Sequence, residues 1–403
     1  MNSYQKNIID NLDVENKALI PNQLARVGEI FNFVKGRYTL VGSVSGVGKT
    51  AFVDDSLILK PYEWVKSTNS PLHFEVLYIS MERQARFKHA KFTSWKIYKE
   101  TGYRLDADTI LKNNPFRKLT TEDKTLIKSY QPWAEEMLDS IDLKDGIKTV
   151  EEISGYIEYL RQKLGTLFKT DDNHLYKEDE KILNLFHRKA SFNGEFKQSK
   201  RGKIPIISFT YRDKKYEIQK NSKLFIPHNP DYIVSILIDH IGKTSTKGFT
   251  SKKLALDALD EVLCTARDLY NFNPIPISQF NRSLSDPTRL KYSKGNLEPM
   301  YEDFKDTGNF VESADLILSV FNPYKYQSYD EKGFYKGYDI KGGMLTPNGD
   351  QRFRSLHIIK HSFGSGEISF GLKFIGESMY FSTLPRPDDL IGLQKIYTQI
   401  ATE

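Results

Sequence analysis

Apolar residues recur along the chain with two spacings, one typical of buried strands and one typical of helices. Short apolar runs predict strands at 37–43, 74–80, 232–239, 274–279 and 314–321. Apolar residues three and four positions apart predict helices at 51–59, 82–101 and 252–270, and mixed helical patterns over 105–165. Strands that alternate with helices are typical of an α/β fold with a central, mostly parallel sheet. Antiparallel strands are predicted at 355–382, with turns at 364–366 and at Gly376.

The stretch 169–230 departs from this pattern. It opens with polar residues and carries two hairpin signals, Asn193-Gly194 and a polar turn at 212–215 between two strand-like runs. We interpret it as a β-rich insertion into one α/β domain. The expected division is a helical lead at 1–35, the α/β domain at 36–168 and 231–385, the insertion at 169–230, and a C-terminal tail at 386–403.

Positive charge is concentrated in the insertion. The chain of 403 residues has a net charge of +6, yet segment 188–223 alone holds eleven Lys and Arg residues against three acids. Such a run indicates contact with nucleic acid or another acidic surface. A solvated hairpin that lysines keep soluble is an equally good interpretation.

The composition excludes several classes of protein. No apolar run approaches the roughly 18 residues of a membrane-spanning helix. The N-terminal residues carry acids and no apolar core of a signal peptide. The single cysteine, Cys264, can form neither an internal disulfide nor a cysteine-rich zinc site. These features favour a cytoplasmic protein without membrane contact.

A phosphate-binding loop is predicted between the first strand and the helix that follows it. Residues 43–50 match the pattern GxxxxGK[ST], except that Ser43 stands at the first glycine. Lys49 is expected to reach the β- and γ-phosphates of a nucleotide, and Thr50 to hold Mg²⁺. Glycines let the loop turn its backbone N–H groups toward phosphate oxygens. The predicted nucleotide-binding residues are Ser43, Gly46, Val47, Gly48, Lys49, Thr50 and Ala51.

Two acids are expected to complete this site. Asp239 ends a buried strand and is predicted to join the Mg²⁺ shell with Thr50. Glu82 follows the strand at 74–80 and is the candidate for activating water. The carboxyl ends of parallel strands meet at one edge of a sheet, so Thr50, Glu82 and Asp239 should lie together. Gly242-Lys243-Thr244 lacks a glycine-rich loop before it and is given no nucleotide role.

Further motifs follow the phosphate loop in a distinctive order. After Glu82 and Asp239 come Ser-Gln-Phe-Asn-Arg at 278–282, Asp-Phe-Lys-Asp-Thr-Gly at 303–308 and Leu-His-Ile-Ile-Lys-His-Ser-Phe-Gly at 356–364. Over roughly residues 35–165 and 231–382, this order resembles the RecA-like P-loop motor domain of DnaB-type replicative helicases, in a short version similar to those of phages and plasmids.

The resemblance implies a role for each matching residue. Glu82 matches the acid that activates water, Gln279 a sensor of the γ-phosphate, and Lys360 a lysine supplied to the neighbouring subunit's ATP. The matching DNA-binding residues are Arg282, Lys305, Asp306 and Gly308, although Arg282 also fits a structural role. The family implies ATP and Mg²⁺ as cofactors, a homo-hexameric ring, 5′→3′ movement on single-stranded DNA, and a primase or loader as partner.

The chain departs from the family pattern at one functional position. Ser362 stands where the family has an arginine that reaches the next subunit's ATP. Such an arginine accelerates hydrolysis about 10³–10⁵-fold in some NTPases. Three explanations stay open: Arg352 or Arg354 on the same predicted hairpin replaces it across the subunit interface, hydrolysis is slow, or the ring is unconventional.

Two other functions remain as alternatives to the helicase. The first is a nucleotide-gated DNA-binding or loading ATPase with slow hydrolysis, which the missing arginine and the basic insertion favour. The second is a strand-exchange ATPase of the RecA/RadA type, which the Ser-Gln-Phe-Asn-Arg stretch disfavours. DNA-stimulated ATP turnover separates a motor from a nucleotide-gated binding protein.

Overall fold

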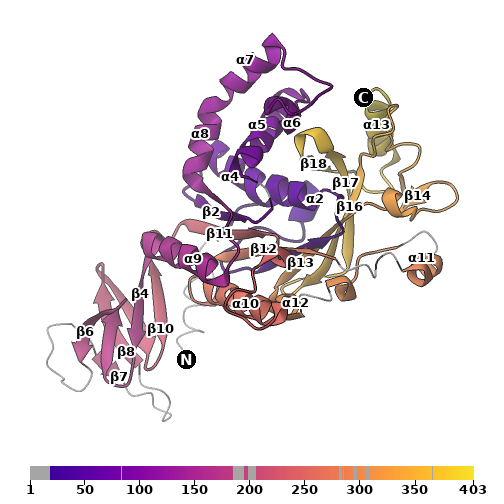
Figure 1. The fold of residues 1–403 in the computed structure, drawn as a ribbon. Helices are drawn as coiled ribbons and strands as arrows, with labels where there is room; N and C mark the ends of the chain where they lie inside the picture. Colours follow the sequence, from indigo (N-terminus) through magenta and orange to yellow (C-terminus); the bar gives the residue numbers. More distant parts are fainter. Residues whose placement is uncertain are drawn as a thin grey trace.

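A nine-stranded sheet runs through the centre of the molecule. The computed structural model describes residues 19–82, 84–184, 195–197, 206–280, 284, 286–293, 297–304, 308–364 and 366–403. The strand order is β18-β17-β16-β13-β1-β12-β11-β2-β3 (Figure 1). Strands β13 to β3 are parallel, whereas β16, β17 and β18 pair antiparallel. The strands are β1 (Thr39–Ser43), β2 (His73–Ser80), β3 (Ile141–Asp145), β11 (Tyr232–Asp239), β12 (Asn273–Gln279), β13 (Leu316–Phe321), β16 (Phe353–His361), β17 (Ile368–Ile375) and β18 (Tyr380–Thr383).

Helices cover both faces of the sheet, as the alternation of strands and helices predicted (Figure 1). Successive residues of a central strand face opposite layers, so Ile236 and Ile238 belong to one apolar cluster and Leu237 to the other. The first cluster includes α9 (Val150–Leu164), α10 (Lys252–Asp268) and α12 (Gly308–Ser313). The second includes α3 (Lys49–Phe52), the π-helix η1 (Val53–Leu59), α4 (Lys60–Ser67), α5 (Ala85–Thr101) and α8 (Gln131–Ser140).

The remaining elements are short. The helices are α2 (Ala25–Gly28), α6 (Ala107–Ile110), α7 (Thr121–Ser129), α11 (Pro287–Ser293) and α13 (Leu390–Ala401). The 3-10 turns are η2 (Ile241–Lys243), η4 (Tyr301–Phe304), η5 (Tyr324–Tyr326) and η6 (Gly376–Ser378), and a small hairpin is formed by β14 (Phe334–Tyr335) and β15 (Tyr338–Asp339). No helix in the described part of the chain has the length and apolar character to cross a membrane.

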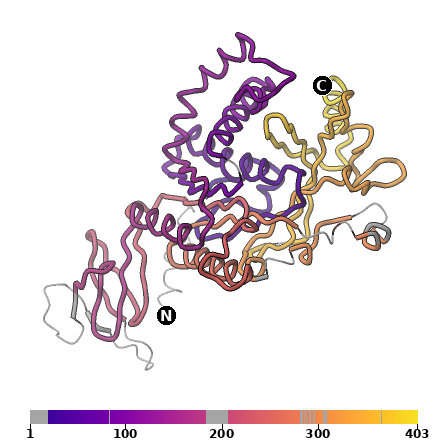
Figure 2. The backbone as a smooth tube through the Cα atoms, in the orientation of Figure 1, coloured from indigo at the N-terminus to yellow at the C-terminus, as the bar shows by residue number. Residues whose placement is uncertain are grey.

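The insertion forms two small antiparallel sheets that project from the main body between α9 and β11 (Figure 2). One sheet has the order β10-β4-β5-β6 and the other β7-β8-β9. They share an apolar core that contains Phe168, Phe209 and Ile218. The strands are β4 (Gly165–Thr170), β5 (His174–Lys177), β6 (Glu180–Asn184), β7 (Glu195–Lys197), β8 (Ile206–Tyr211), β9 (Lys214–Gln219) and β10 (Lys223–Pro227).

The insertion is also packed against the α/β domain. Phe225 of β10 contacts the rings of Tyr270 and Phe272, at centroid distances of 5.4 Å and 6.0 Å. The β8–β9 hairpin confirms the predicted turn, whose residues Arg212 and Asp213 both have positive φ. The strands begin at Gly165, four residues before the predicted boundary, because α9 runs directly into β4. The Asn193-Gly194 turn lies outside the described residues.

Three expectations about local structure are corrected. The region 105–165, expected to be helical, supplies the edge strand β3, whose alternating charges hide its apolar positions. In the described part of the lead, Ile20 pairs with Phe33 around the short helix α2, and both side chains enter the domain's own core. The expected tail contains α13, which buries two of its residues, Leu393 and Ile400.

Candidate nucleotide-binding site

The phosphate-binding loop lies between β1 and α3, where the sequence predicts it. Gly46 and Gly48 adopt the left-handed backbone region, with φ of 77° and 98°. A Cβ atom on Gly48 would also lie 3.1 Å from the ring of Phe374, so this position requires glycine twice over. Val47 is buried beneath the loop, while Ser45 and Gly46 are exposed at its rim.

Ser43 and the glycine before it have structural reasons for their identity. Ser43 is fully buried as the last residue of β1, and its hydroxyl donates to the Val44 carbonyl at 2.9 Å. A Cβ atom on Gly42 would lie 2.2 Å from the ring of Phe304 and 2.6 Å from that of Phe280. The strand therefore packs directly against the two segments that carry the predicted DNA-binding motifs.

Lys49 points along the carboxyl edge of the sheet. Its ammonium donates to the Ser278 carbonyl at 2.7 Å, from the strand that pairs with β1. Burial lowers the pKa of Lys49 to about 8, and the charges of Asp239 and Glu82 oppose that shift. A bound polyphosphate would supply the missing negative charge, which makes this lysine a good phosphate ligand.

Thr50 and Asp239 meet as the sequence predicts. The Thr50 hydroxyl donates to Asp239 Oδ1 at 3.3 Å, and the aspartate is 2% exposed at the end of β11. The described residues contain no cluster of three or more His, Cys, Asp or Glu side chains that could hold a metal alone. One hydroxyl and one carboxylate fit Mg²⁺, which usually takes its remaining ligands from nucleotide phosphates and water.

Glu82 lies next to this pair and is held by residues of the neighbouring strand end. Its Oε1 atom is 3.0 Å from His240 Nε2 and 3.8 Å from Lys243 Nζ. Burial lowers the pKa of His240, and the charge of Lys49 lowers it further. A neutral His240 donates a hydrogen bond to Glu82 without neutralising its charge, so the glutamate stays available as a base.

The β12 end brings the predicted sensor to the same edge. Gln279 is the last residue of β12, pairs in register with Ser43, and is exposed. The structure therefore brings the phosphate loop, Glu82, Asp239 and Gln279 to the carboxyl ends of neighbouring parallel strands.

The C-terminal cations do not share this arrangement. Arg352 is 4% exposed and binds Glu377 at 2.7 Å and Glu403 at 3.0 Å. Arg354 is 8% exposed, and its Nε donates to the Val47 carbonyl of the chain's own phosphate loop at 2.8 Å. The expectation that either arginine reaches across to another subunit is therefore not supported, because both guanidinium groups are buried and bound within their own chain.

Lys360 is also bound within its own chain. Its ammonium donates to the carbonyls of Val311 and Glu312, at 3.2 Å and 2.9 Å, at the end of α12. Ser362 is tied to the sheet edge by its backbone N–H, which donates to the Asp315 carbonyl at 2.8 Å. A lysine held by carbonyls at the surface can exchange those partners for a phosphate more readily than a buried arginine can.

The predicted DNA-binding residues are described only in part. Arg282, Lys305 and Asp306 lie outside the described residues, and Gly308 is described only as the first residue of α12. The segment just before them is anchored by Arg289, which binds the buried carboxylate of Asp303 at 2.5 Å.

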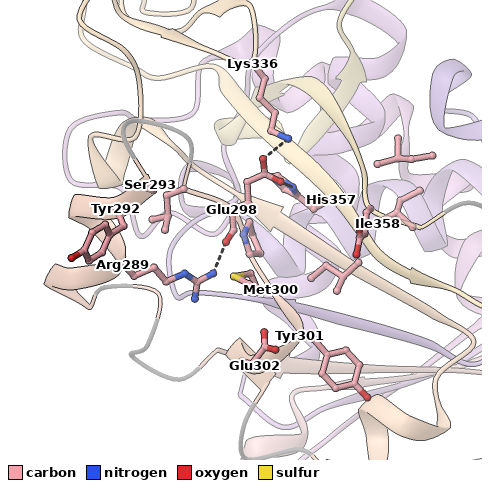
Figure 3. A pocket seen from close by; sticks show the side chains of 15 residues that line it. Arg289, Tyr292, Ser293, Glu298, Met300, Tyr301, Glu302, Lys336, His357 and Ile358 are labelled. Carbon is pink, nitrogen blue, oxygen red and sulfur yellow. Dashed lines mark hydrogen bonds and ion pairs between the residues drawn. The ribbon is translucent and has the colours of Figure 1, made fainter.

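A separate cavity of about 810 Å³ lies beside this anchored segment, between α11 and the strands β16 and β17 (Figure 3). Its cations are already paired, since Lys336 binds Glu298 at 2.6 Å and Arg289 binds Asp303. Buried His357 has its pKa lowered to about 3 by that burial, so it adds no charge. A neutralised cavity of this kind is a poor phosphate site, and the nucleotide chemistry stays with the phosphate loop.

Three contacts of the site were not predicted. His240 binds the catalytic candidate Glu82, Arg354 supports the phosphate loop from beneath, and Lys325 donates to the Ser45 carbonyl at 2.9 Å on the exposed rim. His240 had a detectable signal, because it directly follows the predicted metal aspartate. Lys325 and Arg354 are distant in sequence, and only the pairing of β1 with β13 brings their strands near the loop.

Comparisons with known proteins agree with this architecture. No family model matches the chain, and no curated protein matches its sequence. Among solved structures it is similar to an ATPase domain of a DnaB-like helicase, at 14% identity and a TM-score of 0.59 over 95% of this chain and 98% of that one. It is also similar to a DnaB-like replicative helicase described with its primase interactions, at 13% identity and a TM-score of 0.59 over 95% of this chain and 68% of that one. The chain therefore has the RecA-like fold of DnaB-like helicase ATPase domains, which confirms the predicted fold class.

Proposed function

We propose that this protein is an ATP-driven DNA helicase of the replicative type. The observation that carries the proposal is the meeting of Lys49, the Thr50–Asp239 pair and Glu82 at one sheet edge. A phosphate ligand, a metal pair and an exposed carboxylate are the three parts that nucleotide hydrolysis requires. The fold of DnaB-like ATPase domains supports the choice of DNA as the track.

Each residue has one task in the proposed reaction. The loop N–H groups and Lys49 bind the phosphates of ATP, and Thr50 with Asp239 holds Mg²⁺. Bound Mg²⁺ offsets the charge that develops on the phosphates. Glu82 accepts a proton from the attacking water, and its hydrogen bond to His240 keeps the carboxylate oriented. Gln279, at the adjacent strand end, senses the γ-phosphate.

The proposal includes a homo-hexameric ring around single-stranded DNA, with 5′→3′ movement. Lys360 is its candidate for contacting the ATP of a neighbouring subunit, and Arg282, Lys305, Asp306 and Gly308 are its candidates for contacting DNA. A phosphate contact from Lys305 and close backbone approach at Gly308 would suit a DNA strand. The similar DnaB-like helicase was described with primase, and we extend such a partner, or a loader, to this chain.

One observation favours a second function. Arg352 and Arg354 are both engaged within their own chain, and Ser362 offers no guanidinium. Without an arginine from the neighbouring subunit, hydrolysis would be slow, and the protein would act as a nucleotide-gated DNA-binding or loading module.

Steady-state ATP hydrolysis with and without single-stranded DNA separates the two. For a motor we expect many turnovers per site, stimulation by DNA, and a loss of about 10²–10⁴-fold in Glu82→Gln with nucleotide binding kept. Binding of ATP with no turnover, unaffected by DNA, would replace the helicase with the nucleotide-gated module.

A further inference from the structure

A buried polar cluster lies directly beneath the nucleotide site and has no part in the reaction described above. Its members are Asp54, Tyr78, Lys88 and Asp239, none of which is more than 2% exposed. Lys88 Nζ lies 3.0 Å from Asp54 Oδ2 and 3.5 Å from Asp239 Oδ2, and it also donates to the Tyr78 hydroxyl. That hydroxyl donates to Asp54 Oδ1 at 2.8 Å.

The cluster divides the two oxygens of Asp239 between different partners. Oδ2 faces the Lys88 ammonium, while Oδ1 accepts the hydrogen bond of Thr50 at 3.3 Å. A carboxylate free to rotate about its last bond would present either oxygen to the metal side. A buried ammonium on one oxygen removes that freedom, because turning away would leave a buried positive charge with a weaker set of partners.

The cluster also joins the two segments that carry the reaction. Asp54 belongs to the continuous helix that starts at Lys49, and Lys88 lies in the first turn of α5, just after Glu82. Helix α5 is fixed at its start, where the Ala85 N–H donates to Asp145 at 2.8 Å. The Lys88 ammonium thus connects the phosphate-loop helix, the Glu82 segment and the end of β11 at a single point.

We propose that Lys88 is a positioning residue for Asp239, which it orients so that Oδ1 faces the Mg²⁺–nucleotide complex. This inference rests on the proposed nucleotide function of the site. Groups that orient a metal ligand typically change metal affinity about 10–100-fold when they are removed. Lys88 touches neither the nucleotide nor the metal, so its effect should fall on the metal requirement and not on nucleotide binding itself.

The test removes the positive charge together with its structural counter-charge. Lys88→Met alone would leave two buried carboxylates without a cation, which is strongly destabilising. The double variant Lys88→Met/Asp54→Leu removes one charge of each sign and keeps similar side-chain volumes. The matched control is Lys60→Met/Asp55→Leu, because that buried pair, 2.6 Å apart, lies beside the cluster and does not contact Asp239.

The readout is binding of a fluorescent, slowly hydrolysed ATP analogue at increasing Mg²⁺ concentration. We expect the Lys88/Asp54 variant to need about tenfold more Mg²⁺ for half-maximal binding, with Mg²⁺-free binding unchanged. The Lys60/Asp55 variant should keep the wild-type Mg²⁺ requirement even if its melting temperature falls. An unchanged requirement in a folded Lys88/Asp54 variant would overturn the proposal.

Two further outcomes are decisive. If the double variant does not fold, Tyr78→Phe removes the hydroxyl that binds both Lys88 and Asp54 and keeps every charge. It should then raise the Mg²⁺ requirement by a smaller factor, and no change would reject the positioning role. Failure of the wild type to bind the analogue would instead reject the proposed nucleotide function, and with it this inference.

Discussion

The parallel and antiparallel parts of the central sheet both carry charged residues that the sequence assigns to ATP chemistry, and they differ in where those residues point. At the parallel edge, Lys49 and Asp239 lie at the ends of buried segments and face a common space. On antiparallel β16 and its approach, Arg352 and Arg354 turn inward and are bound by their own chain. A strand end therefore exposes chemistry, whereas a strand interior or its paired approach buries it.

The difference follows from what each motif specifies. The phosphate loop dictates backbone angles, and Gly46 and Gly48 adopt the left-handed conformation that the loop requires. The arginines were assigned only because Ser362 lacks a guanidinium, and nothing in the local sequence specified their direction. Glu377 and Glu403, which bind Arg352, are 25 and 51 residues away in the chain.

The largest expected effect is at the parallel edge. Lys49→Ala should lower ATP turnover by about 10²–10³-fold, because it removes the cation that stabilises charge on the transferred phosphate. The fold should persist, since the substitution also relieves the burial of an ammonium. Turnover and circular dichroism measured together check both parts. Unchanged turnover with a native spectrum would contradict the assignment of the phosphate loop.

A smaller effect is expected from Arg354→Met. The substitution keeps the packing against Phe374 but leaves the Val47 carbonyl without its partner, at a cost of about 1–3 kcal/mol. If Arg354 supports its own loop, nucleotide affinity should fall by a factor of about 5 to 150.

Mixing subunits distinguishes support within the chain from a contact between chains. Arg354→Met subunits mixed with Lys49→Ala subunits should show no more turnover than the two separate preparations predict. Recovery of turnover in the mixture would mean that Arg354 acts on a neighbouring subunit's ATP, and it would restore the expectation that the structure does not support.

Most of the fold was predictable from the sequence, because the parallel strands are continuous apolar runs. Strands β2, β11, β12 and β13 agree closely with the predicted ranges. The edge strand β3 was missed, since its alternating acids and lysine resemble a helix surface. The helix α13 was missed because its apolar residues are mixed with polar ones near the terminus, and only tertiary contacts bury Leu393 and Ile400.

The candidate site was predictable wherever a residue follows a strand, and not where a residue supports another from a distance. Lys49, Thr50, Glu82 and Asp239 were each predicted from local sequence, and their relative placement follows from the parallel sheet. Lys88 and Asp54 gave no signal, because a lysine and an aspartate on two amphipathic helices usually face solvent. Only the packing of both helices on the same face of the sheet brings them together.

The smallest expected effect is a pH dependence confined to the parallel edge. Lys49 has a pKa of about 8 in the nucleotide-free protein, while burial lowers the pKa of Arg354 only to about 10. Phosphate binds the charged lysine, so affinity should be nearly constant below pH 8 and should fall as the pH rises above it. Between pH 7 and pH 9, the charged fraction of Lys49 falls by about tenfold, and affinity should fall by up to the same factor. Binding of the fluorescent analogue across this range measures the effect, and Lys49→Arg, whose guanidinium stays charged, should flatten the profile. A profile that falls equally in Lys49→Arg would assign the pH dependence to another group and remove this distinction between the two parts of the sheet.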